Sequence, residues 1–118
     1  MSNRLALIIE DDIDLSVIFS ESLKAAGFVT EIVRDGSLAV ERLATAQPEI
    51  VVLDLHLPNV SGEKLLAQIR KDPRLSATRV IICTADPRMA DPLNDIADLV
   101  LIKPVSFSQL RDLAKRLA

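Results

Sequence analysis

The sequence predicts a three-layer α/β domain, in which helices cover both faces of a parallel five-stranded sheet. Five short apolar runs recur at regular intervals, and segments in which apolar residues follow helical spacing separate them. Strands that alternate with helices form βαβ units with right-handed crossovers, which build a doubly wound (βα)5 architecture. The predicted strands span residues 5–9, 28–33, 50–53, 80–83 and 99–102.

The strand order follows from how polar each run is. Leu5–Ile9 and Ile50–Leu53 are apolar throughout, which is typical of central strands covered on both faces. The run 28–33 carries Thr30 and Glu31, which indicates an edge strand. The order 2-1-3-4-5 satisfies these constraints. That order places the carboxyl ends of the first and third strands at the crevice where ligands bind in such sheets.

Apolar stripes predict the helices between the strands. The last helix has the clearest start, because Ser106–Gln109 forms a capping box and Val105 and Leu110 occupy the positions of a hydrophobic staple. The stripes of the preceding helices are Leu15, Ile18, Phe19, Leu23 and Ala26, then Ala39, Val40, Leu43 and Ala44, then Leu65, Leu66 and Ile69.

The segment after the fourth strand is irregular. The dipeptides at 86–87 and 91–92 are both Asp-Pro, and each has the pattern of a helix start. Both cannot start the same helix, because a proline inside a helix costs about 3 kcal/mol. We therefore expect a short or displaced fourth helix in this segment.

Composition limits the classes of function. The 118 residues fit one domain that spans residues 1–118, with 49% hydrophobic and 26% charged residues. No apolar run approaches the roughly 20 residues of a membrane span. The net charge is −3, and Tyr and Trp are absent, so we expect no nucleic-acid or membrane partner. The short apolar start and the single Cys83 predict a cytoplasmic protein.

Carboxylates follow two neighbouring strands of the predicted sheet. The first strand is followed by Glu10, Asp11 and Asp12, and the third strand ends on Asp54. Carboxylates this close raise one another's pKa unless a cation compensates, and a hard oxygen site of this kind suits Mg²⁺. The alternative is that Asp11, Asp12 and Asp14 only cap the first helix.

Two further polar residues end strands at the same edge. Thr84 ends the fourth strand and Lys103 follows the fifth. Taken alone, the threonine is explained as a helix cap and the lysine as a counter-charge. Four strand ends that deliver two acidic groups, a hydroxyl and an ammonium to one edge are harder to obtain by chance, so we predict a functional site.

These residues resemble the receiver domains of bacterial two-component response regulators, either stand-alone or as a module of a longer protein. The resemblance covers nearly the whole chain and implies the flavodoxin-like fold of that family. The residues that carry it are Asp11-Asp12, Asp54 to Gly62 (DLHLPNVSG), Thr84-Ala85 and Lys103-Pro104.

The resemblance implies a phosphoacceptor and a Mg²⁺ site. Asp54 corresponds to the aspartate that accepts the phosphoryl group, a reaction in which a carboxylate is the nucleophile. Asp12 corresponds to a direct Mg²⁺ ligand, and Asp11 to a ligand that acts mainly through water. Asp54 itself and the backbone carbonyl of His56 complete the implied metal shell.

The resemblance also implies the switch residues. Lys103 pairs with the phosphoryl oxygens, the Thr84 hydroxyl donates a hydrogen bond to the phosphoryl group, and Pro104 follows a cis peptide bond. Val100 and Val105 depart from the pattern, because receivers often carry aromatic residues at these positions. We therefore expect the signal to be read through other elements, including residues 87–94.

The implied function is a phosphorylation-dependent switch rather than an enzyme. Its partners are a histidine kinase or a phosphotransfer protein and a downstream protein, and the chain is a monomer or a weak phosphorylation-dependent dimer. One alternative is a pseudo-receiver that binds partners without phosphorylation. Another is a haloacid dehalogenase-type phosphatase, which requires an aspartate where this chain has His56 and usually carries a cap domain.

Overall fold

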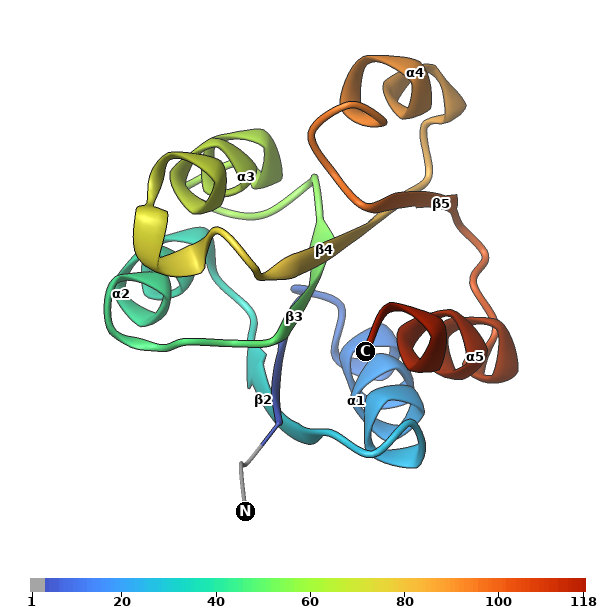
Figure 1. Cartoon of the computed structure of the whole chain (residues 1–118). Coiled ribbons are helices and arrows are strands. Elements are labelled where there is room, and N and C mark those ends of the chain that lie inside the picture. Colours follow the sequence, from blue (N-terminus) through green and yellow to red (C-terminus); the bar gives the residue numbers. More distant parts are fainter. Residues whose placement is uncertain (1–3) are drawn as a thin grey trace.

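The computed structural model of the protein describes residues 4–118, and strands and helices alternate along the chain as predicted (Figure 1). The strands are β1 (Leu5–Ile9), β2 (Val29–Val33), β3 (Ile50–Asp54), β4 (Arg79–Thr84) and β5 (Leu99–Ile102). The helices are α1 (Ile13–Ala25), α2 (Gly36–Thr45), α3 (Gly62–Lys71), α4 (Ala90–Leu93) and α5 (Phe107–Leu117), with two short 3-10 helices at Pro73–Leu75 and Pro87–Met89.

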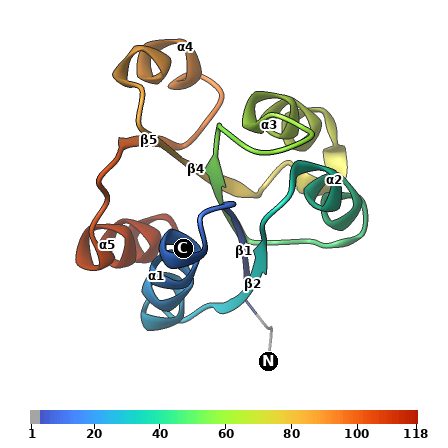
Figure 2. The ribbon, with the colours of Figure 1, turned by 180° about the vertical axis from the view of Figure 1, so that it is seen from behind.

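The five strands form one parallel sheet in the order β2-β1-β3-β4-β5, which confirms the predicted order. Helices α1 and α5 cover one face, whereas α2, α3 and α4 lie on the other (Figures 1 and 2). Every residue of β3 is buried, and so is every residue of β1 after Leu5. Alternate residues of β1 enter opposite cores, because Leu7 packs on the α2–α3 side and Ile8 on the α1–α5 side. Two covered faces explain why these strands lack polar alternation.

The fourth helix is short, as the paired prolines predicted. The Asp86 side chain accepts a hydrogen bond from the Arg88 N–H and so caps the 3-10 helix at Pro87–Met89. α4 follows directly with four residues, and Pro92 is the third of them. The first turn of a helix tolerates proline because its N–H groups have no partner within the helix.

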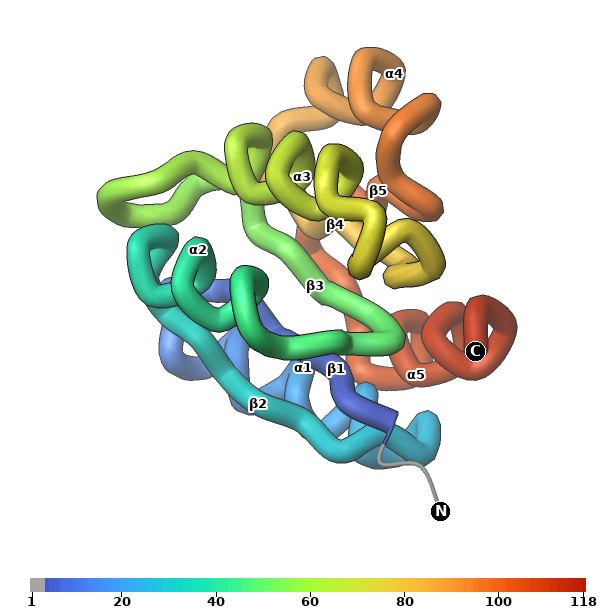
Figure 3. Tube along the Cα trace, turned by 60° about the vertical axis from the view of Figure 1, so that its left-hand side comes forward, coloured from blue at the N-terminus to red at the C-terminus, as the bar shows by residue number. Residues whose placement is uncertain are grey.

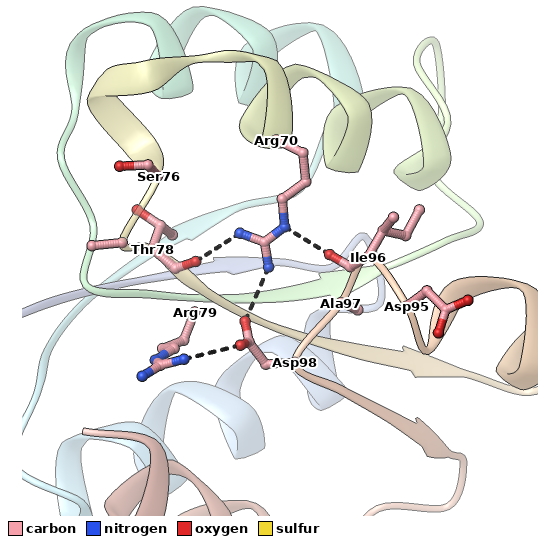
Figure 4. A pocket seen from close by; sticks show the side chains of 9 residues that line it. Arg70, Ser76, Thr78, Arg79, Asp95, Ile96, Ala97 and Asp98 are labelled. Carbon is pink, nitrogen blue, oxygen red and sulfur yellow. Dashed lines mark hydrogen bonds and ion pairs between the residues drawn. The ribbon is translucent and has the colours of Figure 1, made fainter.

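At the amino ends of β4 and β5, Arg70 joins α3 to two loops (Figure 4). Its Nε donates to the Ile96 carbonyl at 2.6 Å, and its Nη1 donates to the Thr78 carbonyl at 2.9 Å. Its Nη2 lies 3.0 Å from Asp98 Oδ2, which also accepts from the Val80 N–H at 2.7 Å. The guanidinium thus fixes the segment between α4 and β5 against the segment between α3 and β4.

Within residues 4–118, no helix is both long enough and apolar enough to cross a membrane.

Candidate functional site

The carboxyl ends of β3, β4 and β5 bring three predicted site residues to one edge of the sheet. Asp54 is the last residue of β3 and only 4% exposed, and Thr84 is the last residue of the neighbouring β4 and fully buried. Lys103 directly follows β5, and its backbone N–H donates to the Thr84 carbonyl at 2.8 Å. Its Nζ reaches back along this edge to within 3.5 Å of Asp54 Oδ1.

Glu10 also belongs to this group, although the sequence reasoning gave it no role of its own. It follows β1 directly and is 1% exposed, and its Oε1 accepts a hydrogen bond from Lys103 Nζ at 2.9 Å. One carboxylate oxygen from each of Glu10, Asp11 and Asp54 lies within 4.8 Å of the others. Three carboxylates therefore share this edge with one lysine.

The geometry departs from the expected role of Asp12 as a direct metal ligand. Asp12 is the N-cap of α1, and its Oδ1 accepts a hydrogen bond from the Leu15 N–H at 2.9 Å. Its backbone N–H donates to Glu10 Oε2 at 3.2 Å. Helix capping, the alternative weighed above, thus describes Asp12, whereas Asp11 remains with the carboxylate group.

Sheet register is the signal that would have identified Glu10. Ile9 of β1 pairs with Leu53 of β3. The residues that follow this pair, Glu10 and Asp54, therefore lie at the same level of the sheet. Counting outward from the paired apolar runs places Glu10 beside Asp54, one residue before Asp11 and Asp12.

At this edge three carboxylates face one ammonium, so negative charge is in excess unless a cation binds. Burial raises the pKa of Glu10 to about 7, and the nearby negative charge of Asp54 adds to that effect against the hydrogen bond from Lys103. Burial would lower the pKa of Lys103, but its hydrogen bond to Glu10 and the charges of Asp54 and Glu10 together raise that pKa. Lys103 stays charged, and the remaining negative charge with its oxygen donors fits a hard cation such as Mg²⁺.

The loops around Asp54 are held by close contacts. The His56 N–H donates to Asp54 Oδ1 at 3.3 Å, while the imidazole is exposed. Gly62, the first residue of α3, packs so closely that a Cβ there would overlap the carbonyl oxygen of Asp54. The Asp86 N–H donates to the Thr84 hydroxyl oxygen at 3.1 Å. The loops that follow β3 and β4 are therefore tied to the two residues that end those strands.

The remaining predicted positions do not join the carboxylate group. The Lys103–Pro104 peptide bond is cis, which confirms the expectation for Pro104. Val100 is half-buried on β5 and packs against the core on the α2–α3 side.

The chain matches the response regulator receiver domain family over residues 6–115 and belongs to that family. It is 30% identical to the probable methanogenesis regulatory protein FilR2 of Methanothrix harundinacea, over 91% of this chain and 76% of FilR2. It is 31% identical to the phosphate regulon regulator PhoB of Rhizobium meliloti, over 87% of this chain and 47% of PhoB. The chain thus spans about half the length of PhoB and of several other curated relatives.

Solved structures agree with this assignment. A CheY-like receiver domain from Methylobacillus flagellatus superposes with a TM-score of 0.86 at 26% identity, over 99% of this chain and all of that one. CheY4 of Vibrio cholerae has the same fold, with a TM-score of 0.88 at 21% identity and the same coverage. The receiver family and the flavodoxin-like fold are therefore confirmed. Receiver domains are regulatory parts of two-component systems. They interact with histidine kinases and downstream effectors, and they bind Mg²⁺ at an acidic pocket.

Proposed function

We propose that this domain is a signalling switch in which Asp54 accepts a phosphoryl group from a histidine kinase or a phosphotransfer protein. The observation that carries the proposal is the position of Asp54 at the tip of β3, with Lys103 Nζ 3.5 Å from its carboxylate and other carboxylates around it. A carboxylate placed beside an ammonium, in a group of oxygen donors that fits Mg²⁺, meets the main requirements of phosphoryl transfer.

In the proposed transfer, an Asp54 carboxylate oxygen attacks phosphorus, and the bond between phosphorus and the donor histidine nitrogen breaks. No base is required, because the attacking carboxylate carries no proton when ionised. Lys103 would pair with the phosphoryl oxygens, since its Nζ lies 2.9 Å from Glu10 Oε1 and 3.5 Å from Asp54 Oδ1. The Thr84 hydroxyl, at the end of the neighbouring β4, would donate a hydrogen bond to the product.

Glu10, Asp11 and Asp54 are the residues whose oxygens would hold Mg²⁺, together with the predicted backbone carbonyl of His56. The ion would supply positive charge that neutralises the phosphoryl oxygens during transfer. Asp12 is left with its capping role, because its carboxylate is used by the first turn of α1.

Intact-mass measurement after incubation with acetyl phosphate tests the proposal. We expect one phosphoryl adduct that depends on Mg²⁺ and that is absent from the Asp54→Asn variant. Asp12→Asn is the matched control, because asparagine is also a good N-cap and the variant keeps the rest of the carboxylate group. No adduct on the unmodified protein, under conditions that label another receiver domain, would instead support an interaction module that works without phosphorylation.

A further inference from the structure

The outer edge of β2 offers backbone hydrogen-bonding groups that face away from the sheet. Within residues 4–118, β2 ends the sheet and pairs with no strand other than β1 (Figure 3). The Val29 N–H donates to the Arg4 carbonyl, and the Val33 carbonyl accepts from the Glu10 N–H. In a parallel strand, alternate residues direct both backbone groups to the same neighbour. Residues 29, 31 and 33 therefore face β1, and Thr30 and Ile32 direct their N–H and C=O groups outward.

A groove with a volume of about 620 Å³ runs beside this edge. One wall is formed by the last three residues of β2 and the residue that follows them, and the other by one side of α2. The lining residues are Glu31, Ile32, Val33, Arg34, Leu38, Glu41, Arg42 and Thr45. Ile32 contributes its backbone edge, because its side chain packs toward the core on the α1–α5 side. The groove therefore lies against the free backbone of the strand.

The chemistry of the groove specifies its occupant. The charges of its lining residues cancel, since two are acidic and two are basic, and Glu31 and Arg42 already form an ion pair with an Nη2–Oε1 distance of 2.8 Å. The apolar side chain of Leu38 is 55% exposed in the groove, and Val29 at the start of the same strand is also 55% exposed. A neutral groove with an apolar wall does not favour a polyanion. The free backbone groups require a partner in extended conformation.

The groove is linked to the phosphorylation site through the start of α2. The loop that follows Asp54 makes two hydrogen bonds with the start of α2. The Gly36 N–H donates to the Pro58 carbonyl at 3.0 Å, and Asn59 Nδ2 donates to Asp35 Oδ2 at 2.5 Å. Asp35 is the N-cap of α2. Gly36 packs so closely against Val60 that a Cβ at position 36 would overlap the backbone of Val60. A shift of this loop therefore moves the helix that forms one wall of the groove.

We propose that the groove between β2 and α2 binds an extended, uncharged segment of a partner protein as a sixth strand, with apolar side chains at alternate positions. The segment would pair with the outward backbone groups of Thr30 and Ile32 and cover Leu38. Its affinity would depend on phosphorylation through the contact of Asp35 and Gly36 with the loop after β3. This dependence rests on the function proposed above, whereas binding to the groove does not.

The test uses a blocked, fluorescently labelled peptide of alternating valine and threonine as the probe, with the full chain as its target. We expect the peptide to shift the amide NMR signals of Thr30 and Ile32, and we expect Leu38→Lys to weaken its binding at least tenfold. Val40→Lys is the matched control, because Val40 is an exposed apolar residue of α2 that does not line the groove. It should leave the affinity unchanged.

A second variant removes a backbone donor. Ile32→Pro deletes an N–H that faces away from β1, a position at which an edge strand tolerates proline. We expect it to abolish peptide binding, whereas Ile32→Val, which keeps the N–H, should preserve it. Should Ile32→Pro fail to fold, Leu38→Lys decides the question alone.

Three results would overturn the proposal: no peptide binding, shifts at another surface, or concentration-dependent shifts of the same amides without peptide together with a doubled mass. The last result would assign the edge to a second copy of the chain. Repeating the titration after acetyl phosphate treatment separates the two proposals. An Asp54 adduct without a change in peptide affinity contradicts only the coupling, and the absence of an adduct contradicts only the phosphorylation.

Discussion

The two ends of the sheet both hold acidic groups beside a cation, but they balance charge in different ways. At the amino end, Asp98 accepts from Arg70, Arg79 and Val80, and the guanidinium of Arg70 reaches two carbonyls as well. At the carboxyl end, one ammonium faces three carboxylates. The first network satisfies its own groups and holds loops in place. The second has carboxylate oxygens to spare, which suits the binding of a hard cation such as Mg²⁺.

The largest effect is expected at the carboxyl end, from Lys103→Ala. Among residues 4–118, the variant removes the only ammonium that pairs with Asp54. We therefore expect the rate of labelling by acetyl phosphate to fall about 100-fold, as for the loss of one charge-stabilising donor. Time-resolved intact mass measures this rate. Lys115→Ala, an exposed lysine on α5, is the control. A rate within twofold of the unmodified protein would show that Lys103 serves the fold alone.

At the amino end, Arg70→Ala should change stability instead of labelling. It removes three hydrogen bonds that join α3 to the loops before β4 and β5, so we expect a loss of about 2 kcal/mol in the free energy of unfolding. Urea denaturation measures this loss, and Lys71→Ala, at the neighbouring exposed residue, is the control. A labelling rate that fell as much as in Lys103→Ala would contradict the division between the two ends.

Glu10→Gln tests which acidic residue binds the metal. Glutamine keeps an oxygen for Lys103 but not the negative charge, so we expect Mg²⁺ affinity to fall about tenfold, equal to about 1.4 kcal/mol. Asp12→Asn should change this affinity little, because it keeps the cap of α1. Isothermal titration calorimetry compares the two variants. A larger loss in Asp12→Asn would return the direct metal role to Asp12.

The smallest effect concerns an ion pair on the surface, between Glu31 and Arg42. The hydrogen bond from Arg42 lowers the pKa of Glu31 below its ordinary value of 4.5. A lowered pKa in the folded state contributes stability above pH 4.5, and this contribution is lost as the pH falls through the lowered value. Because both side chains are more than a third exposed, we expect Glu31→Gln to cost at most about 1 kcal/mol at pH 7. Urea denaturation at pH 7 and at pH 3 should show a smaller cost at the lower pH.

The fold, and most of the residues that meet at the carboxyl end of the sheet, were predictable from the sequence, because the signals are local. Apolar runs gave the strands, and their polar residues identified the edge. Asp54, Thr84 and Lys103 were found because each ends or follows a strand. Glu10 and Asp12 were harder to separate, since adjacent acids give the same pattern and only the register of β1 against β3 distinguishes them. The contacts of Arg70 join residues up to 28 positions apart and leave no local pattern.

The hydrogen bond between Asp86 and Thr84 limits how far the molecule must move in the proposed switch. A hydroxyl has one hydrogen to donate and two lone pairs to accept with. The Asp86 N–H uses one lone pair, so the hydrogen remains available to an acceptor that arrives at Asp54. Thr84 can therefore hold the start of the loop after β4 and a new ligand at the same time, and the loop can follow the hydroxyl without first being released.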